Sequence, residues 1–333
     1  MLFQRCCVCL TLLLIALCAT SQTVEAQSTV GAHSSIPALS REQREQEDDP
    51  TTELSGSANR TVVDELHKES QKVARFRKGF FQGMQLSGSQ IGGGGDDLSL
   101  TTIEANAGFA VPLGSFDNLL VVTPTFRTDF VQAPDSTDIP ATLYETGVRF
   151  FHRKEISDVL SSMVIVSPLI RSDFTTSEDA FRLFGLALLS WEAVPDELTL
   201  SAGAVFLGRE DLPVLPAVGL RWTPDPCWRL DLQFPQPRLS RLISKDGANS
   251  ESWAYLGGGL GGSTWAVTRT NGLEDELTLR DFRFVAGYEK LISGNKGGFA
   301  EAGWVFGRSM EYVRSEFERD FDDTFVVRAG ISF

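Results

Sequence analysis

Charged residues of both signs recur at even spacings in several segments of the chain. Arg127 and Asp129 are two residues apart, and so are Asp281 and Arg283. Side chains two residues apart along a β-strand point to the same face, so each segment places opposite charges on one face. Such a face can bind ions or polar solutes, or its charges can pair with one another. The near balance of the two signs favours pairing, because a selective pore usually carries an excess of one sign.

On this parity, a set of charged residues is predicted to share the interior face of a closed barrel. An arginine in the middle of a lipid-facing surface costs about 2–4 kcal/mol, so a face with these charges must point away from lipid. The sequence leaves open whether they line a channel or close it by pairing. The candidate lumen-lining residues are Glu104, Arg127, Asp129, Glu145, Arg149, Arg221, Arg229, Asp231, Asp281, Arg283, Glu289, Glu301 and Arg328.

The sequence offers little other chemistry. His33 and His67 precede the predicted strands, and His152 stands beside Arg153 at a predicted strand end, where a turn position is favoured over catalysis. We find no nucleophile motif, phosphate-binding loop or His/Cys cluster with metal spacing. Acidic loops such as 274–276 lack the calcium-loop pattern, so a solvated acidic rim is favoured over a cation site. We therefore predict no enzyme activity, no catalytic residue, no cofactor and no resident metal.

The chain ends in an alternating segment that predicts a barrel strand. Apolar residues occupy one face of 325–333, and mostly small or polar residues occupy the other, as expected for a strand between lipid and lumen. The final aromatic resembles the signal that directs outer-membrane barrels to their insertion machinery, although a strand that ends a soluble domain can look the same. The candidate assembly signal comprises Phe325, Val327, Ile331 and Phe333.

The N-terminal 78 residues are predicted to lie outside the barrel. Residues 1–26 have the basic start, apolar stretch and small-residue cleavage pattern of a removable signal peptide. Residues 27–78 are predicted to be a disordered periplasmic leader, because most of this segment is too polar to bury a core. Within it, 61–78 has the spacing of a short amphipathic helix, either a lead-in to the barrel or a plug that enters it. Only Cys227 follows the signal, which excludes an intramolecular disulfide.

Composition limits the class of protein. The formal net charge of −14 argues against nucleic acid and anionic lipid surfaces as partners. A hydrophobic content of 42% with 30 glycines suits an ordered, β-rich chain. No segment after the signal approaches the roughly 18 to 20 apolar residues that a membrane helix requires, so a chain embedded in a bilayer must satisfy its backbone in a closed barrel.

Residues 79–333 are predicted to form an all-β, closed, antiparallel up-and-down transmembrane β-barrel. Strand, turn and strand alternate throughout, and we expect about 14 strands, with 12 as the alternative. Separate strands are expected at 252–260 and 263–270, joined by a turn at Gly261 and Gly262. The segment 235–251 is expected to be a long outer loop. Short inner turns, longer outer loops and an even strand count are typical of such barrels.

Several stretches in the last third of the chain resemble a bacterial domain-of-unknown-function family of predicted outer-membrane β-barrel proteins. They are GLRWTPDPCWRLDLQFPQPRLSRLI (219–243), SWAYLGGGLGGSTWAV (252–267), LRDFRFVAGYEK (279–290), GGFAEAGWVFGR (297–308) and DDTFVVRAGISF (322–333). The resemblance implies the barrel and its compartment. It carries no activity and no catalytic residue to this chain.

The sequence therefore predicts an exported outer-membrane barrel for the passage or binding of an unknown small solute. Outer-membrane lipid and the barrel-insertion machinery are its expected partners, and nucleic acid is not. Two alternatives stay open. One is a structural or surface-interaction barrel without transport, and the other is a soluble exported β-domain that binds glycan or protein.

Overall fold

The structure is a computed structural model, which describes residues 73–74, 77, 79–93, 96–114, 118–206, 214–233 and 236–333. The predicted signal peptide and nearly all of the predicted leader lie outside these residues and stay predictions. The described residues contain one short 3-10 helix, η3 (Asp135–Thr137). None of their helices is long and apolar enough to cross a membrane.

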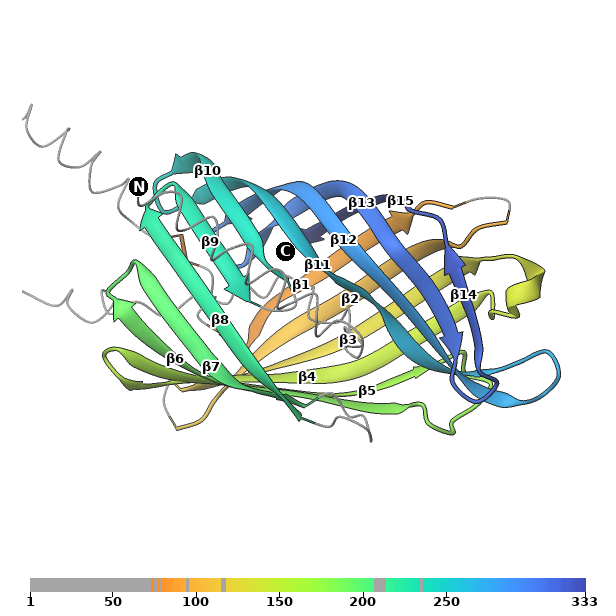
Figure 1. The fold of residues 1–333 in the computed structure, drawn as a ribbon. Helices are drawn as coiled ribbons and strands as arrows, with labels where there is room; N and C mark the ends of the chain where they lie inside the picture. The colour runs from red at the N-terminus through yellow and green to blue at the C-terminus, as the bar shows by residue number, and fades with distance from the viewer. Residues whose placement is uncertain are drawn as a thin grey trace, which may run out of the picture.

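The described residues form a single antiparallel sheet (Figure 1). Its strands are β1 (Phe81–Ile91), β2 (Ser99–Pro112), β3 (Leu119–Gln132), β4 (Thr142–Ser157), β5 (Leu160–Ser172), β6 (Phe181–Val194), β7 (Leu198–Phe206), β8 (Val214–Asp225), β9 (Trp228–Gln233), β10 (Arg238–Asp246), β11 (Ser250–Thr268), β12 (Glu274–Ile292), β13 (Lys296–Tyr312), β14 (Phe317–Phe321) and β15 (Thr324–Ser332).

The sheet closes on itself as a 14-strand barrel, which confirms the predicted fold class. Strands from β1 to β13 pair with their sequence neighbours, and β15 pairs with both β13 and β1. The short β14 pairs only with the far end of β13, so it continues the wall of β15 rather than adding a place to the ring. We call the end with the β12–β13 turn and the C-terminus the turn end, and the opposite end the loop end.

Two predictions that entered this strand count were wrong. One strand was missed and another was predicted as two strands, so the total was unchanged. The segment predicted as an outer loop contains strand β10, and the two strands predicted at 252–260 and 263–270 are the single strand β11. Gly262 does have a φ of +97°, but β11 pairs with β12 without interruption through it. The glycine therefore kinks a continuous strand and does not end it. Residues 247–249 become a turn at the turn end.

The strands alternate between an apolar outward face and an interior face. Ile103, Phe126, Phe284 and Trp304 point outward and are each about half exposed, at 47–54% of their surface. Apolar side chains exposed to this extent all around the wall match the belt that a barrel presents to lipid. The outward residues of β15 and the adjoining Phe333 belong to this belt, so it contains all four residues of the candidate assembly signal.

A kink bends the loop-end halves of β11, β12 and β13 across the lumen. It passes through Gly262 of β11 and through a register shift between β12 and β13, where Gly307 has a φ of +59°. Beyond the kink, Ala266 of β11 pairs with Ser172 of β5. This bridge joins β1–β5, β11–β13 and β15 into a narrower ring that excludes β6–β10.

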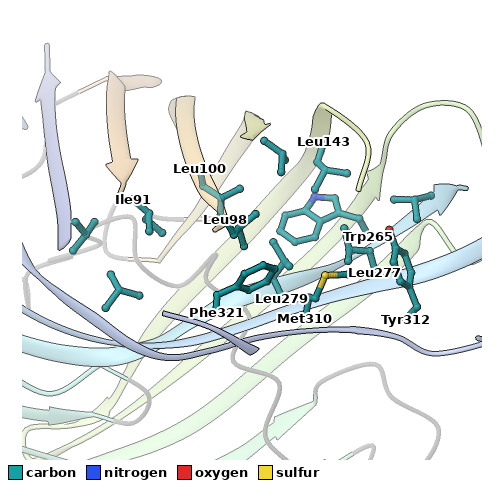
Figure 2. Close-up of a cluster of buried hydrophobic side chains, with 14 residues drawn as sticks. Ile91, Leu98, Leu100, Leu143, Trp265, Leu277, Leu279, Met310, Tyr312 and Phe321 are labelled. Carbon is teal, nitrogen blue, oxygen red and sulfur yellow. The ribbon is translucent and has the colours of Figure 1, made fainter. Parts of the chain in front are cut away.

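A buried apolar cluster fills the narrower ring (Figure 2). Trp265, Leu277, Met310 and Tyr312 come from the bent strands and meet Leu143 of β4, each with 1% or less of its surface exposed. Fully burying a large apolar side chain contributes about 1.5–3 kcal/mol. The cluster therefore seals the loop end with the barrel's own strands.

The corrected topology predicts which turns share a side of the membrane. Cys227, in the β8–β9 turn, is exposed, and it lies at the turn end with Ala248 and Asn295. In a Cys227→Ser background, Ala248→Cys and Asn295→Cys should react alike with a membrane-impermeant thiol reagent on intact cells, and Gly272→Cys should react oppositely. Labelling of Ala248→Cys together with Gly272→Cys would contradict strand β10.

The terminal aromatic also closes the seam between β15 and β1. The backbone N–H of Met84 donates to the carbonyl of Phe333 at 2.9 Å, and the N–H of Phe333 donates to the carbonyl of Met84 at 3.0 Å. Deleting Phe333 removes the side chain and both bonds, whereas Phe333→Ala keeps the bonds. We expect the deletion to lower the yield of heat-modifiable barrel in membranes more than Phe333→Ala does. An unchanged yield in both variants would argue against an assembly role for this residue.

Candidate solute site in the barrel interior

The candidate lumen-lining residues lie on the interior parity of their strands, opposite the exposed apolar belt. Four charged residues occupy neighbouring strands in direct register, as Glu104 of β2, Arg127 of β3, Glu145 of β4 and Arg171 of β5. Their signs alternate across the sheet, so each charge has an opposite charge beside it. Charges directly opposite one another stabilise a sheet when their signs differ. The charges of this row therefore stabilise one another.

Short ion pairs lie in the part of this interior that is nearer the loop end. Arg171 Nε lies 2.6 Å from Glu145 Oε2, and both side chains are almost fully buried. Asp129 receives hydrogen bonds from Arg127 at 2.8 Å and from the Thr102 hydroxyl at 2.5 Å. Removing one partner of a buried pair leaves an uncompensated charge, which typically costs about 3–5 kcal/mol. These pairs therefore fix the positions of the side chains that face the lumen.

The interior charges near β11–β13 and β15 are more open. Arg283 Nε lies 2.6 Å from Asp281 Oδ1, and the Arg283 side chain is 27% exposed. Arg328 lies 3.6 Å from Glu301, and the Tyr255 hydroxyl donates to Glu301 at 2.7 Å. These groups combine pairing with partial exposure, so they can still contact a solute.

Toward the turn end, aromatic rings supplement the ion pairs. Arg238 pairs with Glu289 at 2.5 Å and also stacks 3.7 Å from the Tyr255 ring centroid. The Arg229 guanidinium lies 4.6 Å from the Trp253 ring centroid. Cation–π contacts of this kind contribute about 0.5–2 kcal/mol.

The predicted residues Arg221 and Asp231 pair between β8 and β9. Arg221 Nε lies 2.6 Å from Asp231 Oδ1, and the Arg221 side chain is 43% exposed. Arg149, in turn, interacts electrostatically with Glu104 and Glu145. All thirteen predicted residues are therefore placed by the structure, in several local groups rather than in one site.

Sequence reasoning missed several interior arginines, among them Arg171 and Arg238. Arg171 was passed over because it lies at the end of its strand, beside a predicted loop. Arg238 was assigned to the predicted outer loop that proved to contain β10. The parity of β5 could have identified Arg171, since it faces Glu145 in register. No comparable signal marks β10, whose apolar residues do not alternate regularly.

The interior also carries an apolar row that the sequence did not reveal. Six residues lie directly opposite one another across β3–β8: Val121, Phe151, Ile165, Leu186, Val205 and Leu215. Five strand intervals of about 4.8 Å give a row about 24 Å long. It was missed because strands such as β5 are apolar on both faces. The lumen wall therefore combines charged residues with an apolar row that crosses β3–β8.

A polar latch ties the bent strands to the β3–β4 loop. Arg269 Nε lies 3.0 Å from Asp138 Oδ2, the Thr270 N–H donates to the same carboxylate, and the Tyr312 hydroxyl donates to the Asp138 carbonyl at 2.6 Å. Burial alone would raise the pKa of Asp138, but the hydrogen bonds from Arg269 and Thr270 outweigh it and hold this pKa below its usual value.

Within the described residues, no group of three or more histidine, cysteine, aspartate and glutamate side chains is arranged to hold a metal ion.

No family model matches the chain, and no curated protein is similar to it in sequence. Among solved structures, OccK11 (OpdR) of Pseudomonas aeruginosa is 9% identical, with a TM-score of 0.27, over 79% of this chain and 98% of that one. OccK5 (OpdH) of the same organism is 9% identical, with a TM-score of 0.28, over 78% of this chain and all of that one. At this similarity they carry no inference about solutes, and the barrel class rests on the fold described above.

The latch predicts a pH dependence. A carboxylate with a lowered pKa in the fold contributes stability above its unfolded pKa and loses it as the pH falls through its folded pKa. The thermal unfolding temperature should therefore fall as the pH is lowered through and below the ordinary aspartate range. Asp138→Asn should lower this temperature at neutral pH and weaken its acid dependence. An identical pH profile for the variant, measured by circular dichroism, would exclude a role for Asp138.

Proposed function

We propose that this chain is an outer-membrane β-barrel for the selective passage or binding of small solutes. One observation carries the proposal. Outside the narrower ring, toward the turn end, the interior of the closed barrel holds ion-paired charges that are partly exposed, and its outer face carries an apolar belt. A soluble exported domain would expose that belt to water, so the observations favour a membrane location. Export by the predicted signal peptide and insertion by the barrel machinery are parts of this proposal.

The interior supports restricted rather than open conduction. Its charges are paired, and the loop end is sealed by the apolar cluster. Ion pairs narrow a lumen and leave little net field to select one sign of ion. The expected behaviour is weak conductance of small solutes.

A structural or surface-interaction barrel is the second candidate. Charged contacts at the loop end, such as Arg314 with Asp179 at 2.7 Å, order the loops as a surface for a partner would require. These contacts alone account for the ordered loops, and no partner is needed to explain them. Solute passage therefore stays the primary proposal.

Planar-bilayer recording tests the proposal. The wild-type chain should conduct weakly, and Arg283→Ala or Glu301→Ala should raise its conductance or shift its ion preference, because each change leaves an unpaired charge that draws in water or ions. Phe284→Ala, on the outward face beside Arg283, is the matched control and should change nothing. Large unselective wild-type currents that neither change affects would contradict the paired interior, and no current from any of these chains would contradict passage.

A further inference from the structure

The backbone ladder of the wall stops beside β8. β8 pairs with β9 only from Gly219 onward, and 214–218 pair only with β7 among the described residues. On the other side, β10 pairs with β11 only up to Gly257, so that 259–265 of β11 pair only with β12. The β9–β10 hairpin thus stops short of the loop end, whereas β8 and β11 continue toward it (Figure 1). We call the resulting break between 214–218 and 259–265 the notch.

Among the described residues, no second strand pairs with the edges of the notch. Open sheet edges are not tolerated in lipid, because each unsatisfied backbone group costs several kcal/mol, but they occur where they line a cavity. Pro216 lies in the free stretch of β8, and it has no N–H to satisfy, as is usual for proline on an edge strand. Above the notch, β11 leaves the wall to meet β5 at Ser172. The notch therefore opens toward the lumen.

The apolar row ends at the notch. Its last member, Leu215, lies in the free stretch of β8, and Val205 and Leu186 follow on the next strands. These three side chains are half-buried, whereas Phe151 and Ile165 farther along the row are buried. The accessible part of the row is thus the part nearest the notch.

Glycines lie on β11 at the border of the notch and directly before it. Gly261 has no room for a Cβ, which would lie 2.1 Å from Asp281 Oδ1, and Gly262 is needed at the kink. A Cβ on Gly257 or Gly258 would meet its nearest atom at 3.5 or 3.6 Å, an ordinary contact. Packing therefore does not require glycine at these two positions, which directly precede the 259–265 border of the notch.

We propose that the apolar row binds the apolar body of an amphipathic solute, which enters and leaves the barrel sideways through the notch. This inference rests on the proposed function, because it names the class of solute and its route. Arg153 lies on the interior face of β4, two residues from Phe151, so an anionic end on the solute is favoured. Laurate, an alkyl chain with one carboxylate, is the probe.

Binding is tested by titrating laurate into the full chain in lipid nanodiscs. Val205→Asn and Leu215→Asn should each weaken binding at least tenfold, because burying a large apolar side chain contributes about 1.5–3 kcal/mol and each 1.4 kcal/mol is tenfold in Kd. Val218→Asn, on the outward face of β8, is the matched control and should bind as the wild type does. Absence of laurate binding, or equal binding by all variants, would overturn the inference.

The route is tested by stopped-flow kinetics with a fluorescent laurate analogue. Gly258→Trp should slow association and dissociation together by at least tenfold with Kd unchanged, because an obstructed entrance acts on both rates. Gly88→Trp on β1 is the control, since a Cβ there meets its nearest atom at 3.7 Å. Gly257→Trp replaces Gly258→Trp if the latter does not give a heat-modifiable barrel. Unchanged rates in a folded variant would overturn the lateral route.

The two proposals fail separately. Wild-type conductance without laurate binding would overturn the inference and leave the proposed passage of small solutes intact. Laurate binding that Leu215→Asn weakens, in a barrel without conductance, would support the apolar site and overturn passage.

Discussion

The closed backbone ladder is the constraint on which the rest of this structure depends. Fourteen strands satisfy one another's N–H and C=O groups around the ring, and this closure lets the described part of the chain present an apolar belt. Alternation then follows, because each strand must divide its side chains between lipid and lumen. The charged residues face inward since charge on a lipid-facing surface is costly, and the buried ones lie in ion pairs because an unpaired buried charge is costly. The backbone ladder is bent at the kink and interrupted at the notch, and we expect the functional features of the barrel at these two places.

Much of the fold followed from period-two alternation, and the errors show where that signal ends. β15 was predicted with its faces correctly assigned, because Arg328, Gly330 and Ser332 are clearly distinct from their apolar neighbours. β10 was missed, since its sequence lacks clean alternation and follows two prolines. β11 was divided because adjacent glycines predict a turn, whereas here one glycine supplies a positive φ for a kink inside a long strand. Local turn chemistry could not distinguish these outcomes without the partner strand.

The interior was only partly predictable for a similar reason. Parity identified the charged face, but pairing depends on register between strands, which the sequence alone does not fix. Glu145 illustrates this limit: its close partner is Arg171 on β5, which was not among the predicted residues. The apolar row was invisible because an interior valine and a lipid-facing valine look the same in sequence. Only the register places Val121 and Leu215 at the two ends of one continuous row.

Energetics distinguish two ways out of the lumen. Passage straight through the loop end would have to displace the cluster around Trp265, Leu277 and Met310, all fully buried, and exposing each of them costs about 1.5–3 kcal/mol. The latch at Asp138 and the bridge between Ala266 and Ser172 would have to part as well. Leaving through the notch breaks none of these contacts, because 214–218 of β8 and 259–265 of β11 have no strand between them in the described part of the chain. A wall that is sealed at its end and interrupted at its side therefore favours solutes that can use an apolar side exit, which is the property that the apolar row supplies.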